Sequence, residues 1–172
     1  MQNDFLNLIE TRRSIRSFKP TPVSDEILDK ILKAGTYAPS GMNRQSSTII
    51  AIKSEKYRKI ISKLNAEILK TDKDPYYNAP VVILVLGNPE YSTFVEDGSC
   101  VLENMMLACH SLGLGSVWVH REREIFNSEE GKKLLKEWNL PLNLTGIGSI
   151  AVGYPAEIPD AKPRKENYIV KV

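Results

Sequence analysis

Cysteine is scarce in this chain of 172 residues, which contains only Cys100 and Cys109. Two cysteines are too few for the disulfide framework of a small secreted protein. The surrounding pattern predicts that they share one helix, on which nine positions span roughly 13 Å, beyond the reach of a disulfide. We therefore expect two reduced, buried thiols and a cytoplasmic protein.

Long apolar runs are also missing. The longest, at residues 81–86, is far shorter than the roughly 20 residues that cross a bilayer. The first residues show no basic stretch followed by an apolar one, so we expect no signal peptide. A net charge of +2 is too small to indicate a partner of nucleic acid or membrane. The sequence therefore predicts neither kind of partner.

Several motifs of common catalytic and cofactor sites are absent as well. The Gly-Xaa-Gly segments at 113–115 and 146–148 lack the third glycine of a dinucleotide fingerprint, and there is no P-loop. His110 and His120 have no companion ligands at metal-binding spacing, so no metal site is predicted. No residue is identified as a catalytic acid, base or nucleophile. These absences favour redox chemistry carried out by a bound cofactor.

What the sequence does contain is an alternation of helix and strand patterns. Its length and its hydrophobic content of 42% favour a single domain over residues 1–172. Apolar spacing and capping residues predict helices at 4–11, 24–35, 54–68, 97–112 and 128–138, and strands at 48–52, 81–86, 116–119 and 147–152. Helices between strands predict an α/β (α+β) fold, a three-layer α/β/α sandwich with a central mixed sheet.

The segment after the last predicted strand is rich in proline. Pro155, Pro159 and Pro163 keep it extended, and residues 168–172 then have a strand-forming composition. A strand needs a sheet edge to pair with. Residues 168–172 therefore either complete the sheet of a partner subunit or form an edge strand of the chain's own sheet.

An arginine-rich stretch lies near the start, at residues 11–18. It holds three arginines and two serines, namely Arg12, Arg13, Arg16, Ser14 and Ser17. The guanidinium group is a planar fork that binds two phosphate oxygens at once, and a serine hydroxyl adds a neutral donor. The stretch is typical of a phosphate site, or of a solvated basic turn at a helix end, where cations favour the helix dipole.

Four separated segments form an ordered set. They are Arg-Arg-Ser-Ile-Arg-Ser-Phe at 12–18, Ala-Pro-Ser-Gly-Met-Asn-Arg-Gln at 38–45, residues 97–116, and Val-Gly-Tyr-Pro-Ala at 152–156. In order and spacing this set resembles the nitroreductase family of FMN-dependent oxidoreductases, over nearly the whole chain. The resemblance implies a homodimer with two FMN sites, each built from both subunits, and it favours exchange of the C-terminal strand between them.

Carried over by position, the resemblance implies a basic pocket for the FMN phosphate. Arg12, Arg13 and Ser14 correspond to ligands of the phosphate and the ribityl chain. Lys162 and Arg164 match a basic pair that returns to the phosphate late in the chain. A solvated turn gives no reason for a second basic cluster roughly 150 positions later, whereas a phosphate site does.

The resemblance also assigns residues to the flavin ring. Arg16 corresponds to the cation near the N1–C2=O edge of the isoalloxazine, where the reduced flavin carries negative charge. Two further segments match ones that contact the ring, the first supplied by the partner subunit and the second passing the N5 edge with its backbone amides. Their residues are Pro39, Ser40, Gly41 and Asn43 in the first, and Trp118, Val119 and His120 in the second. His120 is alternatively a surface histidine beside Arg121 and Glu122.

The sequence departs from the family where the substrate pocket is formed. Ser46 and Ser47 stand where an aromatic residue is expected, and the connection over residues 86–97 is short where larger relatives insert helices. Asn78 is a candidate for a further polar contact to the flavin.

The resemblance implies a ping-pong cycle. NADH or NADPH passes hydride to flavin N5, and an electron-poor acceptor such as a nitroaromatic or a quinone then receives it. Recognition of the 2′-phosphate that NADPH has and NADH lacks needs one cation. The candidates are Arg44, Arg121 and Arg123. One alternative is a flavin-binding sensor or carrier without turnover. Another is a nucleic-acid-binding arm, which the small net charge disfavours.

Overall fold

The computed structural model describes residues 4–172. At its centre is a four-stranded sheet in the order β1-β2-β4-β3. The strands are β1 (Ser47–Ile52), β2 (Val81–Gly87), β3 (Gly115–Val119) and β4 (Thr145–Gly153). Neighbouring strands are antiparallel in all three pairs.

In this detail the sheet differs from the mixed sheet that the sequence predicts. Parallel pairing is present in an isolated bridge that joins Ser14, outside the four strands, to Ser116 of β3. A helix between two strands does not fix their relative direction when a long loop follows it. Residues 70–80 are such a loop, and they turn the chain so that β2 enters antiparallel to β1.

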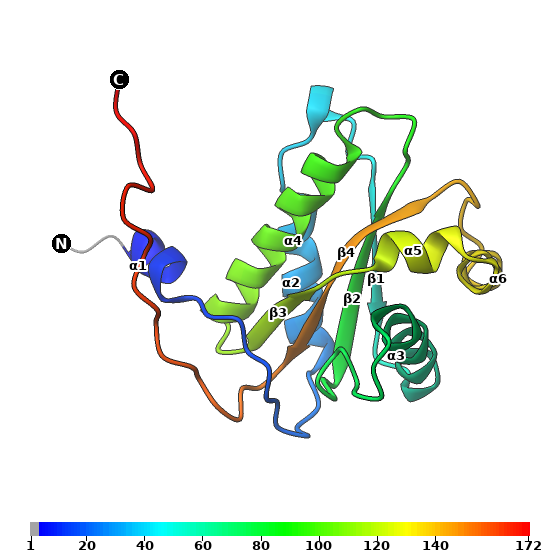
Figure 1. Ribbon diagram of the computed structural model, residues 1–172, viewed down its shortest axis with the longest axis horizontal. Helices are drawn as coiled ribbons and strands as arrows, with labels where there is room; N and C mark the ends of the chain where they lie inside the picture. The colour runs from blue at the N-terminus through cyan, green and yellow to red at the C-terminus, as the bar shows by residue number, and fades with distance from the viewer. Residues whose placement is uncertain (1–3) are drawn as a thin grey trace.

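Helices cover both faces of the sheet, which confirms the predicted three-layer sandwich (Figure 1). On one face lie α2 (Asp25–Thr36) and α4 (Phe94–Ser111). On the other lie α3 (Glu55–Leu69), α5 (Glu122–Asn127) and α6 (Glu129–Glu137). In the part of the chain that the structure describes, no helix combines the length and the apolar composition needed to span a membrane.

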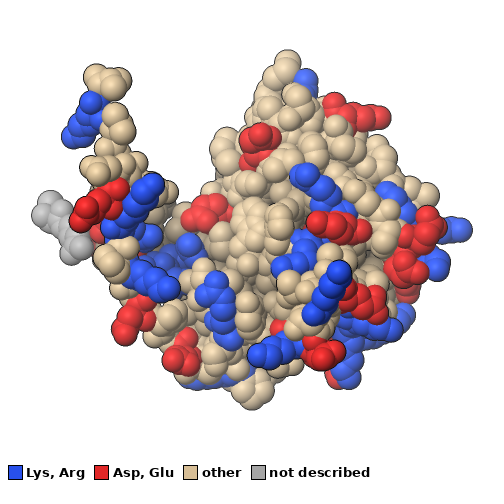
Figure 2. Space-filling view, in the orientation of Figure 1, with Lys and Arg blue, Asp and Glu red and all other residues tan. Residues whose placement is uncertain are grey.

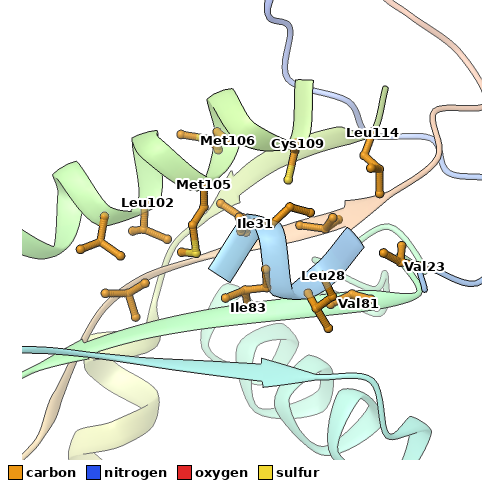
Figure 3. Close-up of a cluster of buried hydrophobic side chains, with 14 of the residues drawn as sticks. Val23, Leu28, Ile31, Val81, Ile83, Leu102, Met105, Met106, Cys109 and Leu114 are labelled. Carbon is orange, nitrogen blue, oxygen red and sulfur yellow. The ribbon is translucent and has the colours of Figure 1, made fainter. Parts of the chain in front are cut away.

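The central strand β2 supplies side chains to both layers. Its apolar residues at odd-numbered positions 81–85 face α2 and α4, and those at even-numbered positions 82–86 face the opposite layer. Figure 3 shows Ile83 of β2 below Ile31 of α2, with Met105 of α4 beside them. Successive side chains of a strand point to opposite faces, so a run that is apolar at every position predicts a strand covered on both sides.

Each predicted helix and strand is present, with shifts at some boundaries. The first helix, α1 (Asp4–Thr11), has the predicted range and packs beside α4. α4 begins at Phe94, three residues before the predicted start at residue 97. α5 is not predicted, because it has only six residues, of which Ile125 and Phe126 are apolar, too few for a periodic signal.

α4 buries one stripe of its surface. Leu102, Met105 and Cys109 are buried against the sheet, whereas Cys100 is exposed. The expectation of two buried thiols is therefore wrong for Cys100, because a helix that packs one face on a sheet exposes the opposite face. Burial raises the pKa of the Cys109 thiol to about 12, which keeps this thiol protonated.

The tail, residues 154–172, runs back along the arginine-rich stretch. The Ala156 N–H donates to the Ser17 carbonyl (2.9 Å), and Phe18 forms an antiparallel bridge with Pro155. Residues 168–172 are exposed, form no strand within the described chain, and end away from the sheet (Figure 1). The alternative of an edge strand on the chain's own sheet is therefore not realised here, and pairing with a partner's sheet stays a prediction.

Candidate functional site

One buried side chain fixes the arginine-rich stretch to the core. Ile15 is 4% exposed and packs against Gly115 at the start of β3. A Cβ at position 115 would lie 2.6 Å from Ile15 Cγ1, so the glycine leaves the space that this isoleucine fills. The Ile15 N–H also donates to the Ser116 carbonyl (3.0 Å). The residues on either side of Ile15 are thereby held along β3.

Arg12 and Arg13 line a cavity of 170 Å³, called the Arg12 cavity below. It lies between the arginine-rich stretch, the end of α4, the start of β3 and the tail. Its wall also includes Thr11, His110, Ser116, Pro155 and Ile158.

Two polar atoms of the cavity residues are buried and lack a hydrogen-bond partner among residues 4–172. They are Arg12 Nη1 and Ser116 Oγ, and the Ser116 hydroxyl lies beside the Cys109 thiol, whose charged form it favours. Arg12 is held at another edge by Glu103, whose Oε1 lies 3.8 Å from Arg12 Nε. A buried donor on a permanent cation is unfavourable without an acceptor. The Arg12 cavity therefore presents donors suited to an anion such as a phosphate group.

Arg13 uses its guanidinium differently. Its Nη1 donates to the carbonyls of Glu10 and Arg12, at 2.7 Å each. These contacts place a cation at the C-terminal end of α1, where it interacts favourably with the helix dipole. Arg13 thus agrees in part with a basic turn at a helix end. Arg12 agrees instead with an anion site.

The other residues predicted for the phosphate do not line this cavity. Ser14 pairs with Ser116 in the parallel bridge. Lys162 and Arg164 are exposed on the tail, beyond Ile158, which lines the cavity. Figure 2 shows Lys and Arg side chains gathered on the tail and beside it. The structure thus brings the two predicted basic clusters to the same side of the molecule.

Arg16 lies in a different cavity, of 550 Å³, called the Arg16 cavity below. Asp74 and Asn78 of the loop at 70–80 also line it. Asp74 holds this loop in place, because its carboxylate accepts from the N–H groups of Tyr76 (2.9 Å) and Asn78 (2.7 Å). Asn78, the candidate for a further polar contact, is therefore placed beside Arg16.

The loop at residues 38–45 is fastened to the start of α4. Asp97 is buried, and its Oδ1 accepts from the Gly41 N–H (2.9 Å). The Ser40 hydroxyl accepts from the Gln45 N–H (3.0 Å), which closes the loop on itself. Asn43 has a left-handed backbone with φ 54°. Sequence reasoning treats Asp97 only as a helix start, since nothing in its spacing reveals a contact 56 positions away.

This loop and the arginine-rich stretch lie at opposite ends of α4. Asp97, near the first turn, holds the loop, whereas His110, near the last turn, lines the Arg12 cavity. The 18 residues of α4 extend over roughly 27 Å at 1.5 Å per residue. One chain therefore does not bring the residues Pro39, Ser40, Gly41 and Asn43 to its own arginine-rich stretch (Figure 1).

The third predicted segment follows β3 to its end. The Val119 side chain is buried, and Trp118 packs over Gly148, where a Cβ would lie 2.7 Å from Trp118 Cζ2. His120 is exposed, and its carbonyl accepts from Asn65 Nδ2 (2.8 Å). The side chains of Trp118 and Val119 are thus engaged in the core, and the exposed His120 side chain agrees with a surface histidine.

A buried polar network holds the turn after His120, and sequence reasoning does not find it. Glu122 is fully buried, and its Oε1 accepts from the hydroxyls of Tyr76 (2.9 Å) and Ser149. Asn65, which binds the His120 carbonyl, also donates to the Tyr76 hydroxyl (3.2 Å). Burial raises the pKa of Glu122 to about 7, although the Ser149 and Tyr76 hydroxyls favour the charged form. In sequence this glutamate resembles its exposed neighbours.

The fold is an α+β sandwich, and a cavity lined by two arginines lies between its arginine-rich stretch and its tail. The sequence profile of the nitroreductase family matches residues 9–154. The chain belongs to the nitroreductase family, which confirms the resemblance of its four segments.

Three comparisons describe the relatives. A protein of Archaeoglobus fulgidus provisionally named NADH dehydrogenase/NAD(P)H nitroreductase is 34% identical over 90% of this chain and 87% of its own length. An NAD(P)H-dependent FMN reductase of Bacillus subtilis is 29% identical over 94% of this chain and 70% of its length. The crystal structure of a Bacteroides fragilis nitroreductase with bound FMN superposes with a TM-score of 0.91, over 99% of this chain and 100% of that chain, at 27% identity.

Glu122 should make the stability of the fold depend on pH. Between the ordinary value of 4.5 and the folded value of about 7, the folded state keeps a proton that the unfolded chain has lost. Stability therefore falls as pH rises through this window, by up to about 3 kcal/mol. The Glu122→Gln variant should lose this dependence. Its free energy of unfolding, measured with urea, should therefore increase relative to that of wild type between pH 5 and pH 8.

The matched control is Glu124→Gln, because Glu124 is exposed on the same helix. Its stability difference from wild type should stay constant over the same range. A constant difference for Glu122→Gln as well would contradict the assignment of a raised pKa to Glu122.

Proposed function

We propose that this protein is an FMN-dependent oxidoreductase that passes hydride from NADH or NADPH to an electron-poor acceptor. The observation that carries the proposal is the Arg12 cavity, which Arg12 and Ser116 line and where Arg12 Nη1 is a buried donor without an acceptor in the described chain. A phosphate group supplies the missing acceptor. The FMN reductase of B. subtilis and the FMN-bound structure from B. fragilis support the predicted cofactor.

At the phosphate end, the cations proposed to bind the phosphate differ in how deeply they are buried. Arg12 is the inner ligand, since Glu103 fixes one edge of its guanidinium and Nη1 makes no hydrogen bond within the described chain. Arg13 adds positive charge from the end of α1. Lys162 and Arg164, exposed on the tail, would approach the phosphate from the solvent side. Ser14 would contact the ribityl chain between the two cavities.

At the ring end, FMN supplies hydride transfer through its N5 atom. Arg16 contributes a permanent cation that stabilises the negative charge of the reduced N1–C2=O edge. Asn78 in the same cavity contributes a neutral hydrogen-bonding group. Because the side chains of Trp118 and Val119 are engaged in the core, we assign the contact of residues 118–120 with the N5 edge to their backbone.

We propose that the site is completed by a second copy of the chain. Residues 38–45 lie a helix length away from Arg12 and Arg16 of the same chain, so Pro39, Ser40, Gly41 and Asn43 reach the flavin only from a partner. Apolar surface supports this arrangement. On α1, Leu6 is 53% exposed, and on the tail Ile169 and Val170 are 76% and 80% exposed. Burial of such side chains in a dimer is favourable.

The reaction is proposed to follow a ping-pong course, in which the donor leaves before a nitroaromatic or a quinone enters. The chain offers the flavin position and charge, and no acid or base is assigned at the ring. NADH and NADPH are metabolites of the cytoplasm, and we place the enzyme there. The short connection between β2 and α4 leaves the ring accessible to acceptors of different shapes.

The first test is an absorbance spectrum of the purified protein, followed by NADPH or NADH without oxygen. We expect a yellow protein whose flavin bands bleach when the donor is added, and renewed absorbance when a quinone follows. If flavin is bound but neither donor reduces it, the sensor or carrier alternative is supported instead. A colourless protein that takes up no added FMN contradicts the proposal.

Two arginine variants should separate the phosphate end from the ring end. Arg12→Ala should weaken FMN binding by about 10- to 100-fold, because a charged hydrogen bond is lost. Binding of riboflavin, which has no phosphate, should change little. Arg16→Ala should instead lower the flavin reduction potential or the affinity for both flavins. Fluorescence quenching and potentiometry measure these effects.

Arg123→Ala is the control, because Arg123 is exposed on α5 outside both cavities. An equal loss of FMN and riboflavin binding in Arg12→Ala would overturn the phosphate assignment. Unchanged affinity and unchanged potential in Arg16→Ala would overturn its role at the ring.

The tail should be required for the dimer. Replacing Ile169 and Val170 by serine removes apolar area that we propose is buried against the partner. Light scattering should then report the mass of one chain, 19.4 kDa, at concentrations where wild type has twice that mass. Lys171→Ser serves as the control and should remain dimeric. A monomeric wild-type protein that binds FMN tightly would refute the shared site.

A further inference from the structure

His110 lies in the wall of the Arg12 cavity, at the C-terminal end of α4. Its Nε2 is 2.9 Å from the Thr11 hydroxyl. That hydroxyl donates its single proton to the Asn7 carbonyl (2.7 Å), so it can only accept from His110. Nε2 therefore carries a hydrogen, and Nδ1 is the ring atom that gains or loses a proton.

The groups that face His110 are positive or uncharged. Arg12 and Arg13 approach from the arginine-rich stretch, and Thr11 approaches from α1. From β3 and the tail come Ser116, Pro155 and Ile158, which carry no charge. The negative charge on α4 nearest to these groups, Glu103, is paired with Arg12.

This environment disfavours the protonated ring while the cavity holds no anion. Partial burial lowers the pKa of His110, and the charges of Arg12 and then Arg13 lower it further. At neutral pH the imidazole is therefore neutral. A phosphate group removes this disadvantage, because its close to two negative charges offset those of the two arginines and an anion nearby favours the charged ring.

We propose that His110 is a proton-binding member of the phosphate site, which takes up a proton when a phosphate group enters the cavity. This inference rests on the proposed function, since the phosphate is that of FMN. Protonation converts His110 from a neutral wall residue into a third cation beside Arg12 and Arg13. FMN binding is then coupled to pH through a side chain that touches neither the ring nor the substrate.

The sign of the coupling follows from linkage. The ring binds a proton more readily in the complex than in the empty protein. The affinity for FMN therefore rises as pH falls from the pKa of His110 in the complex to its lower pKa in the empty protein. The limit is a tenfold gain for each pH unit when one full proton is taken up. The phosphate of free FMN itself loses a proton near pH 6, so the measurement needs a variant that isolates the histidine.

His110→Gln is that variant, since glutamine keeps an N–H near the position of Nε2 and does not become charged. The dissociation constant for FMN is measured from about pH 6.5 to about pH 8.5, with proton uptake by calorimetry in two buffers of different ionisation heat. Wild type should bind FMN several-fold more tightly at the lower pH and take up protons. His110→Gln should show neither effect, and riboflavin should show neither effect with either protein.

Equal pH dependence and equal proton uptake in the two proteins would overturn the inference and leave the proposed function standing. Failure of wild type to bind FMN at any pH would overturn both. A wild-type measurement covers the case in which the variant does not fold. The chain has two histidines, and inorganic phosphate should move the NMR titration curve assigned to His110 to higher pH. Titration curves that phosphate leaves unchanged would also overturn the inference.

Discussion

The packing of Ile15 against Gly115 determines where each cation of the arginine-rich stretch lies. Because this side chain is buried, the chain on either side runs along β3 and sends its arginines to different cavities. Arg12 and Arg16 are four residues apart, which in an extended chain corresponds to roughly 13 Å. This spacing, which the core of the protein sets, suits the proposed cofactor, with its anionic phosphate at one end and its polar ring at the other.

The length of α4 is a second constraint. Asp97 near its start and His110 near its end belong to different parts of the proposed cofactor environment, and a rigid helix keeps them apart. Both ends are tied down, by the Gly41 N–H on Asp97 and by the Thr11 hydroxyl on His110. A helix that packs on the sheet through Leu102 and Met105 therefore also fixes the two loops that flank it.

Much of the fold follows from the sequence because the pattern is local. The all-apolar run of β2 predicts a strand covered on both sides, and the ordered set of four segments predicts the family. The arginines alone leave a phosphate site and a basic turn as alternatives. What sequence reasoning does not find depends on contacts between distant positions. Asp97 reaches Gly41, and Glu122 reaches Tyr76 and Ser149, across separations that no spacing encodes. The exposure of Cys100 and the direction of β2 are likewise decided by tertiary packing.

The exposed tail has a consequence for how the proposed enzyme is assembled. If each flavin is held by groups from two chains, cofactor binding and subunit association are thermodynamically linked. Flavin binding then stabilises the dimer, and dimer formation strengthens flavin binding. Dilution then releases flavin, and scarcity of flavin dissociates subunits. The amount of complete enzyme rises more steeply than the amount of chain synthesised, so a modest change in expression or in flavin supply produces a larger change in activity.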